Sequence, residues 1–124
     1  MTMTQKEAQQ HIFDLALNHI RKQGGPSLSG LKCAYRGEGG RSCAFAPAIK
    51  EYDEGMEGRS AWVLLERFPE NVIPEAIIAG KVLCQDVQSC HDIEADCGDR
   101  FMENFERNMK DVATTHSLIY TGGI

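Results

Sequence analysis

The sequence lacks a long apolar run. The longest run of this kind, residues 72–79, is interrupted by Pro74 and Glu75, whereas a membrane-spanning helix needs about 20 apolar residues. Residues 1–10 are polar and lack the charged-then-apolar order of a secretory signal. We therefore expect a protein that does not cross a membrane and that works in a cytoplasm.

An even cysteine framework is also missing. The chain has 5 cysteines, and an odd number leaves at least one thiol free or paired between chains. Small secreted domains more often carry an even, closely spaced set of cysteines. The cysteine count therefore favours a reducing compartment.

Motifs of common hydrolases and nucleotide-binding enzymes are absent as well. The sequence has no serine-centred elbow, no paired-histidine metalloprotease motif and no phosphate-binding loop with its lysine. Structural zinc sites usually take their ligands in closely spaced pairs, and five or six residues separate the later cysteines of this chain. We expect no metal and no cofactor. The alternative is a metal-dependent enzyme or zinc-stabilised module that uses Cys84, Cys90, His91 and Cys97.

What is present is the composition of one ordinary domain. With 124 residues, 42% hydrophobic and 25% charged, residues 1–124 are expected to share a single core. The net charge of −5 comes from residues 85–124, which contain eight acidic side chains and three basic ones. Such a surface repels nucleic acid and attracts basic partners. The acidic residues expected to bind a partner protein are Asp86, Asp92, Glu94, Asp96, Glu103 and Glu106.

The two ends of the chain carry the clearest helical patterns. Thr4 followed by Glu7 predicts a capping box and a first helix that stops at Gly24. The last helix is predicted from a stripe of residues three and four apart. Its members are Phe101, Phe105, Met109, Val112 and His116.

Two further helices are predicted between these ends. Ser60 caps a short helix that ends before Pro69 and places Trp62 in the core. Pro74 opens the next helix, which runs to about Ile93 with Gly80 as a weak point or bend.

A β-hairpin is predicted after the first helix. Residues 31–35 and 42–45 favour strands, and the glycine-rich residues 37–40 between them favour a turn. The register decides whether Cys33 faces Cys43 or Ala44. The predicted fold class is therefore α+β: a helix-rich single domain of about four helices with one small β-hairpin.

Basic and aromatic side chains alternate along this hairpin. Tyr35 and Arg36 join the candidate binding residues, and three bases allow nucleic-acid binding as a second alternative. Arg36 stands beside the glycine turn, where a bidentate bond to Glu57 or Asp92 is expected to stabilise the fold.

Two groups of residues together form a recognisable pattern. The first consists of Cys33, Tyr35, Arg36, Gly37, Gly40, Cys43, Ala44, Ile49, Tyr52, Met56, Glu57 and Gly58. The second, on the later helix, consists of Gln88, His91 and Asp92. The pattern resembles a family of small uncharacterised proteins of tailed bacteriophages, although Phe45 stands where that family usually has glycine. The resemblance implies a phage origin and a bacterial host cytoplasm, and it implies no catalytic residue.

The function expected from these observations is that of a phage accessory protein. It binds a host or phage protein without catalysis, through the acidic residues of the second half together with Tyr35 and Arg36. Nucleic acid is an unfavoured partner, because the acidic half repels it.

Overall fold

The computed structural model describes residues 3–29, 32–93 and 98–121. Two two-residue strands, β1 (Leu28–Ser29) and β2 (Lys32–Cys33), pair in antiparallel fashion. Among the described residues there are five α-helices: α1 (Gln5–Gln23), α2 (Ala61–Arg67), α3 (Pro74–Ala79), α4 (Lys81–Asp92) and α5 (Phe101–His116). None of them is long and apolar enough to cross a membrane.

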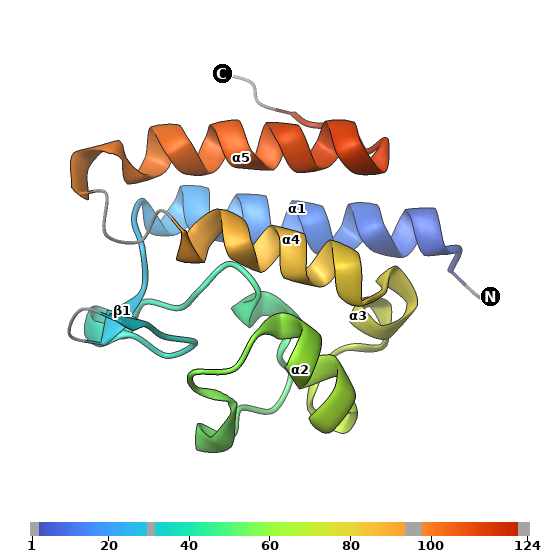
Figure 1. Ribbon diagram of the computed structural model, residues 1–124, viewed down its shortest axis with the longest axis horizontal. Helices are drawn as coiled ribbons and strands as arrows, with labels where there is room; N and C mark the ends of the chain where they lie inside the picture. Colours follow the sequence, from blue (N-terminus) through green and yellow to red (C-terminus); the bar gives the residue numbers. More distant parts are fainter. Residues whose placement is uncertain (1–2, 30–31, 94–97, 122–124) are drawn as a thin grey trace.

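The long helices share one side of the molecule. Helices α1, α4 and α5 lie side by side, and the turn-rich residues 32–60 lie with α2 against the other side of α4 (Figure 1). Between the described strands and α2, the chain makes short 3₁₀ turns at Glu38–Gly40, Ala46–Ala48 and Glu54–Met56. Helix α4 therefore contacts both halves of the fold.

The predicted ends of the first and second helices are confirmed. The Thr4 hydroxyl accepts the Glu7 N–H while the Glu7 carboxylate accepts the Thr4 N–H, which is the expected capping box. The Ser60 hydroxyl caps α2 by accepting the Val63 N–H. The helix-rich character of the chain is likewise confirmed.

The predicted helix from Pro74 to Ile93 is two helices. Gly80 separates α3 from α4 with φ 97° and ψ 159°, a conformation that side chains with a Cβ rarely adopt. The break changes the direction of the chain (Figure 1), and it brings the total to five helices rather than about four.

The predicted β-hairpin is wrong in its pairing. Among the described residues, no ladder joins the two predicted strands, and the one isolated bridge near them pairs Ser42 with Arg36, just after the first strand. Cys33 faces Leu28 of β1 instead of Cys43 or Ala44. The reason is that amides needed for a ladder bond elsewhere: the Tyr35 and Arg36 N–H groups donate to Glu57, and the Phe45 N–H donates to Gln88.

The core lies between the helical layer and the turns. Its largest fully buried side chains include Phe13, Phe45, Phe101, Phe105, Met56 and Met109. The predicted stripe on α5 is buried from Phe101 to Val112, with His116 half-buried at its end. The prediction that Trp62 lies in the core is wrong. Trp62 is 41% exposed, because α2 buries its opposite face through Ala61, Leu64 and Leu65.

A bidentate ion pair joins the two terminal helices. Arg21 Nε and Nη2 on α1 donate to the two Glu106 oxygens on α5, at 2.6 and 2.7 Å. The Tyr120 hydroxyl donates to Glu106 Oε1 at 2.6 Å. The hydrogen bond from Arg21 holds the pKa of Glu106 below its usual value. Glu106 therefore stabilises the fold when it is ionised.

We expect Glu106→Gln to lower the free energy of unfolding at neutral pH by about 1–2 kcal/mol. Because the folded-state pKa is lowered, this contribution is present above the unfolded pKa and is lost as pH falls through the lowered folded-state pKa. Urea unfolding at a series of pH values should show that the free energies of unfolding of the wild type and Glu106→Gln converge in acid. Glu103→Gln, on the exposed side of the same helix, is the control and should follow the wild type; a constant gap for Glu106→Gln across the acid range would contradict the assignment.

Candidate functional site

A row of polar side chains on α4 meets the turns of the first half of the chain. Gln88, His91 and Asp92 are three and four residues apart and share one face of the helix. Gln88 Oε1 accepts the Phe45 N–H at 2.8 Å, and Gln88 Nε2 donates to Asp92 Oδ1 at 2.6 Å. His91 Nδ1 lies 2.9 Å from the same Asp92 oxygen. We call these three residues the α4 polar row.

The hydrogen bonds of His91 define its tautomer. The Ser27 backbone N–H points at His91 Nε2 at 2.9 Å, and a backbone amide can only donate. Nε2 therefore carries a lone pair, and Nδ1 carries the hydrogen that is donated to Asp92. The imidazole is completely buried, and the centroid of the Phe101 ring lies 5.5 Å from its own. His91 thus joins α4 to the segment before β1 through its hydrogen bond with Ser27.

This tautomer opposes metal binding at the one group of three metal-ligand side chains found among the described residues. Cys33, His91 and Asp92 each offer a ligand atom within 4.8 Å of the others. A metal on Nδ1 would require the ring hydrogen to move to Nε2, where it would meet the Ser27 N–H. A metal on Nε2 would displace that same N–H. The residues do not fit a metal unless the Ser27 hydrogen bond breaks.

The alternative zinc site is not assembled among the described residues. Cys84 donates its thiol to Ala76 O on α3, and Cys90 donates to Asp86 O within α4. Cys97 lies outside the described residues. Burial raises the pKa of the Cys84 thiol to about 12 and raises that of Cys43 further still, so both thiols stay protonated near neutral pH and are poor nucleophiles and ligands.

Glu57 holds the backbone at two of the predicted site residues. Its carboxylate accepts the Tyr35 N–H at 2.9 Å, the Arg36 N–H at 3.0 Å and the Tyr52 hydroxyl at 2.6 Å. The predicted contact between Arg36 and Glu57 therefore exists, but the backbone of Arg36 makes it. The guanidinium instead stacks on the Tyr52 ring, 4.0 Å from its centroid.

The acidic candidates do not form one free surface. Glu106 is held by Arg21, and Asp86 Oδ2 lies 2.8 Å from His116 Nε2. Asp92 belongs to the α4 polar row, whereas Glu103 is exposed on α5. Glu94 and Asp96 lie outside the described residues. Three of the described acids are therefore tied to structural partners.

An apolar hollow marks the junction of α2, α3 and α4. Leu65, Ile77, Gly80, Lys81 and Val82 line about 330 Å³ of space. Ile77 is 46% exposed and Val82 56% exposed, and Trp62 stands beside the hollow, with Lys81 Nζ 5.5 Å from its ring centroid. We call these six residues the apolar corner. Sequence reasoning missed it by placing Trp62 in the core.

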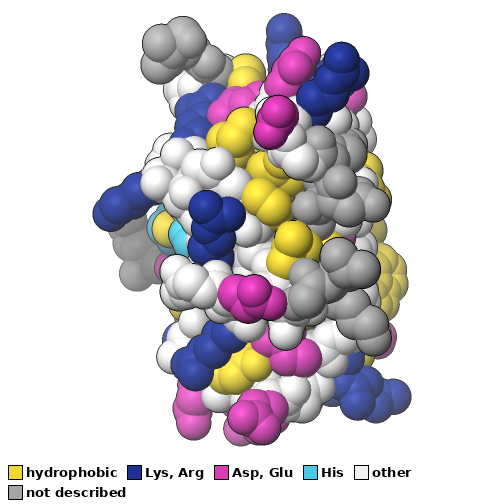
Figure 2. All heavy atoms as spheres, turned by 90° about the vertical axis from the view of Figure 1, so that its left-hand side faces the viewer, with side chains coloured by type: hydrophobic (Ala, Val, Ile, Leu, Met, Phe, Trp, Pro, Cys, Tyr) yellow, Lys and Arg dark blue, Asp and Glu magenta, His cyan; other side chains and the backbone are white. Residues whose placement is uncertain are grey.

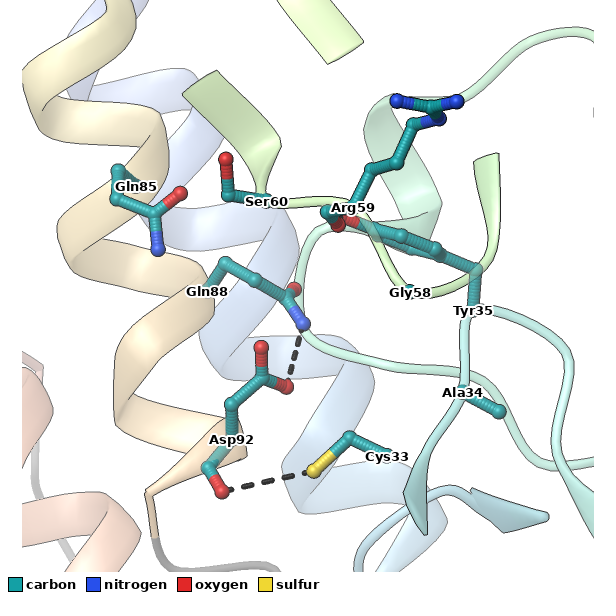
Figure 3. A pocket seen from close by; sticks show the side chains of 9 residues that line it. All are labelled: Cys33, Ala34, Tyr35, Gly58, Arg59, Ser60, Gln85, Gln88 and Asp92. Atoms are coloured by element: carbon teal, nitrogen blue, oxygen red, sulfur yellow. Dashed lines mark hydrogen bonds between the residues drawn. The ribbon is translucent and has the colours of Figure 1, made fainter. Parts of the chain in front are cut away.

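A second hollow, whose lining mixes apolar surface with polar side chains, lies toward the other end of α4. This open-sided hollow of about 310 Å³ lies between α4, the end of β2 with the residues after it, and the start of α2 (Figure 3). We call it the Asp92 pocket. Its lining residues are Cys33, Ala34, Tyr35, Gly58, Arg59, Ser60, Gln85, Gln88 and Asp92. The two residue groups that define the phage-like pattern thus meet at this pocket.

Phe45, which departs from the phage-like pattern, is accommodated without strain. Its φ of −83° and ψ of −12° are ordinary for a residue with a side chain. The ring is buried, and the N–H is the one that Gln88 accepts. No protein-family model, curated protein or solved structure matches this chain.

The contacts of Glu57 and Arg36 predict unequal effects of substitution. Glu57→Ala leaves two backbone N–H groups and a tyrosine hydroxyl without their acceptor, so the free energy of unfolding should fall by about 2–3 kcal/mol. Arg36→Ala keeps those bonds and removes only the stack on Tyr52, which is worth about 1 kcal/mol or less. Chemical unfolding of both variants measures the order. A larger loss for Arg36→Ala than for Glu57→Ala would show that the guanidinium, and not its backbone, stabilises the turn.

Proposed function

We propose that the protein binds another protein, without catalysis, as an accessory protein of a tailed bacteriophage in the cytoplasm of its bacterial host. The phage origin is supported by the residue pattern around Cys33 and Gln88. The binding role is supported by a single observation, the apolar corner. Large apolar side chains exposed together around a hollow are typical of binding surfaces.

The corner has the composition of a binding hot spot. It combines Trp62 with branched aliphatic side chains and a cation at its edge, and tryptophan is enriched among residues that dominate binding energy. Lys81 is paired with Glu66 at 2.9 Å, which leaves the hollow itself without an unpaired charge. The occupant that fits is an apolar side chain from a partner protein, in a contact with an apolar centre and a charged rim.

Two groups with catalytic potential, His91 and Glu57, have structural hydrogen-bond roles, which favours binding over catalysis. Both His91 nitrogens are occupied and its ring is inaccessible. Glu57 accepts three hydrogen bonds within the fold. A general base must reach a substrate proton, and neither residue is placed to do so.

The nucleic-acid alternative has weaker support. On the face shown in Figure 2, lysine and arginine side chains are interspersed with acidic ones and do not gather into a basic patch. Arg36 is stacked on Tyr52 rather than extended along a β-ribbon. Sequence-independent binding of phosphates needs several basic side chains acting together.

Val82→Asp tests the apolar corner. Val82 is exposed, so the charge should leave the fold intact but should weaken partner binding at least tenfold by placing a carboxylate in an apolar contact. The partner is first captured from infected bacteria, identified and purified, and its affinity is then measured by calorimetry with each variant. Ile119→Asp is the matched control, because Ile119 is 70% exposed outside the corner.

Equal affinities for wild type, Val82→Asp and Ile119→Asp would place the contact elsewhere and overturn the proposal. Self-association of the wild type that Val82→Asp abolishes would also overturn it, because the corner would then be covered by a second copy. Light scattering on the purified protein distinguishes that outcome.

A further inference from the structure

Asp92 has one carboxylate oxygen in use and one unused. Oδ1 accepts from Gln88 Nε2 and from His91 Nδ1. Oδ2 has no hydrogen-bond partner among the described residues, and the carboxylate projects into the Asp92 pocket (Figure 3). The side chain is 36% exposed. A ligand in the pocket can therefore reach a fixed, outward-facing acceptor.

The charge of the helix end acts in the same direction. Asp92 is the last residue of α4, and a helix C-terminus carries a partial negative charge. The cation nearest in the lining, Arg59, donates its Nε to Gly55 O at 2.8 Å, and its guanidinium points away from Asp92 (Figure 3). The part of the pocket beside Asp92 is thus negative and suited to a cation.

Further acceptors and an aromatic ring line the same pocket. Gln85 Oε1 accepts one N–H, from Trp62 at 3.2 Å, and a carbonyl oxygen can accept two. The Tyr35 hydroxyl donates to Arg59 O at 2.7 Å, which leaves its own lone pairs as acceptors. The Tyr35 ring forms part of the wall. Several acceptors spread around a tyrosine suit a planar guanidinium, with five donors, better than a compact ammonium.

We propose that the Asp92 pocket binds a guanidinium group, supplied by an arginine side chain of the partner protein. The inference rests on the proposed function for the identity of the partner, but the pocket's preference for guanidinium is a property of this chain alone. The alternative source of the same chemistry is a free small molecule such as agmatine.

The pocket and the apolar corner lie along one face of α4. Lys81, Gln85, Gln88 and Asp92 are spaced four, three and four residues apart, so they follow one stripe of the helix. The stripe is about 16 Å long at 1.5 Å per residue. One partner segment can therefore place an apolar side chain in the corner and an arginine beside Asp92.

The test is an NMR titration of the ¹⁵N-labelled protein with N-acetyl-arginine-methylamide. The side-chain amide signals of Gln85 and Gln88 should shift and saturate at millimolar ligand. The citrulline analogue has the same shape without the charge and is the matched control, which should bind at least tenfold more weakly. In Asp92→Asn the arginine affinity should also fall at least tenfold, while the retained Oδ1 keeps the bonds to Gln88 and His91.

The citrulline comparison uses the wild-type protein, so it decides the proposal even if Asp92→Asn does not fold. Equal shifts with both probes, no saturable shift, or undiminished binding to a folded Asp92→Asn would each overturn the guanidinium site. Agmatine that binds far more tightly than the capped arginine would overturn the protein source. If only these experiments fail while Val82→Asp still weakens partner binding, the proposed function stands without the arginine.

Discussion

The hydrogen bond from the Ser27 N–H to the buried His91 imidazole is the constraint on which the first half of this structure depends. Residues 24–60 form few backbone hydrogen bonds of the regular kind, since their longest described strands have two residues each. Buried amides without an acceptor cost about 1–3 kcal/mol each. The α4 polar row supplies acceptors to Ser27 and Phe45, and Glu57 supplies them to Tyr35 and Arg36.

This arrangement explains why the candidate binding surfaces are where they are. Helix α4 must turn the polar row toward the loops and its apolar residues toward α1 and α5. In the stripe from Lys81 to Asp92, Gln88 is buried, whereas Lys81, Gln85 and Asp92 remain half-exposed. Gly80 sets the direction of α4 and opens the apolar corner at its start, while Gly37 lets the next turn approach Ser27, whose hydroxyl would lie 2.2 Å from an added Cβ.

Local signals in the sequence were enough to predict part of the fold. Thr4 and Ser60 mark helix starts because a cap and its helix are adjacent in the chain. The prediction of a hairpin was wrong because its backbone amides bond to distant side chains. The Phe45 amide bonds to Gln88, 43 residues away, and the Tyr35 amide bonds to Glu57, 22 residues away. The prediction of a buried Trp62 was wrong because a short helix can bury one face only, and three smaller residues occupy that face of α2.

Two residues of the Asp92 pocket, Tyr35 and Asp92, were predicted as binding residues, but the geometry of that pocket and the whole apolar corner were not. Glu57 or Asp92 was expected to bond Arg36, yet propensity cannot say whether a guanidinium or a backbone amide makes the contact. The spacing of Gln88, His91 and Asp92 beside the buried apolar face of α4 was the signal for the polar row, because buried polar groups need partners. Their partners could be found only once the loops were in place.

Native-state hydrogen exchange of the Ser27 and Phe45 amides tests the central claim most directly, because it perturbs nothing. If side chains of α4 hold these loops, both amides should open only with the whole protein, with free energies of opening within about 1 kcal/mol of global unfolding. Exchange at rates typical of exposed loops would contradict the account, since neither amide could then be bound to the α4 polar row.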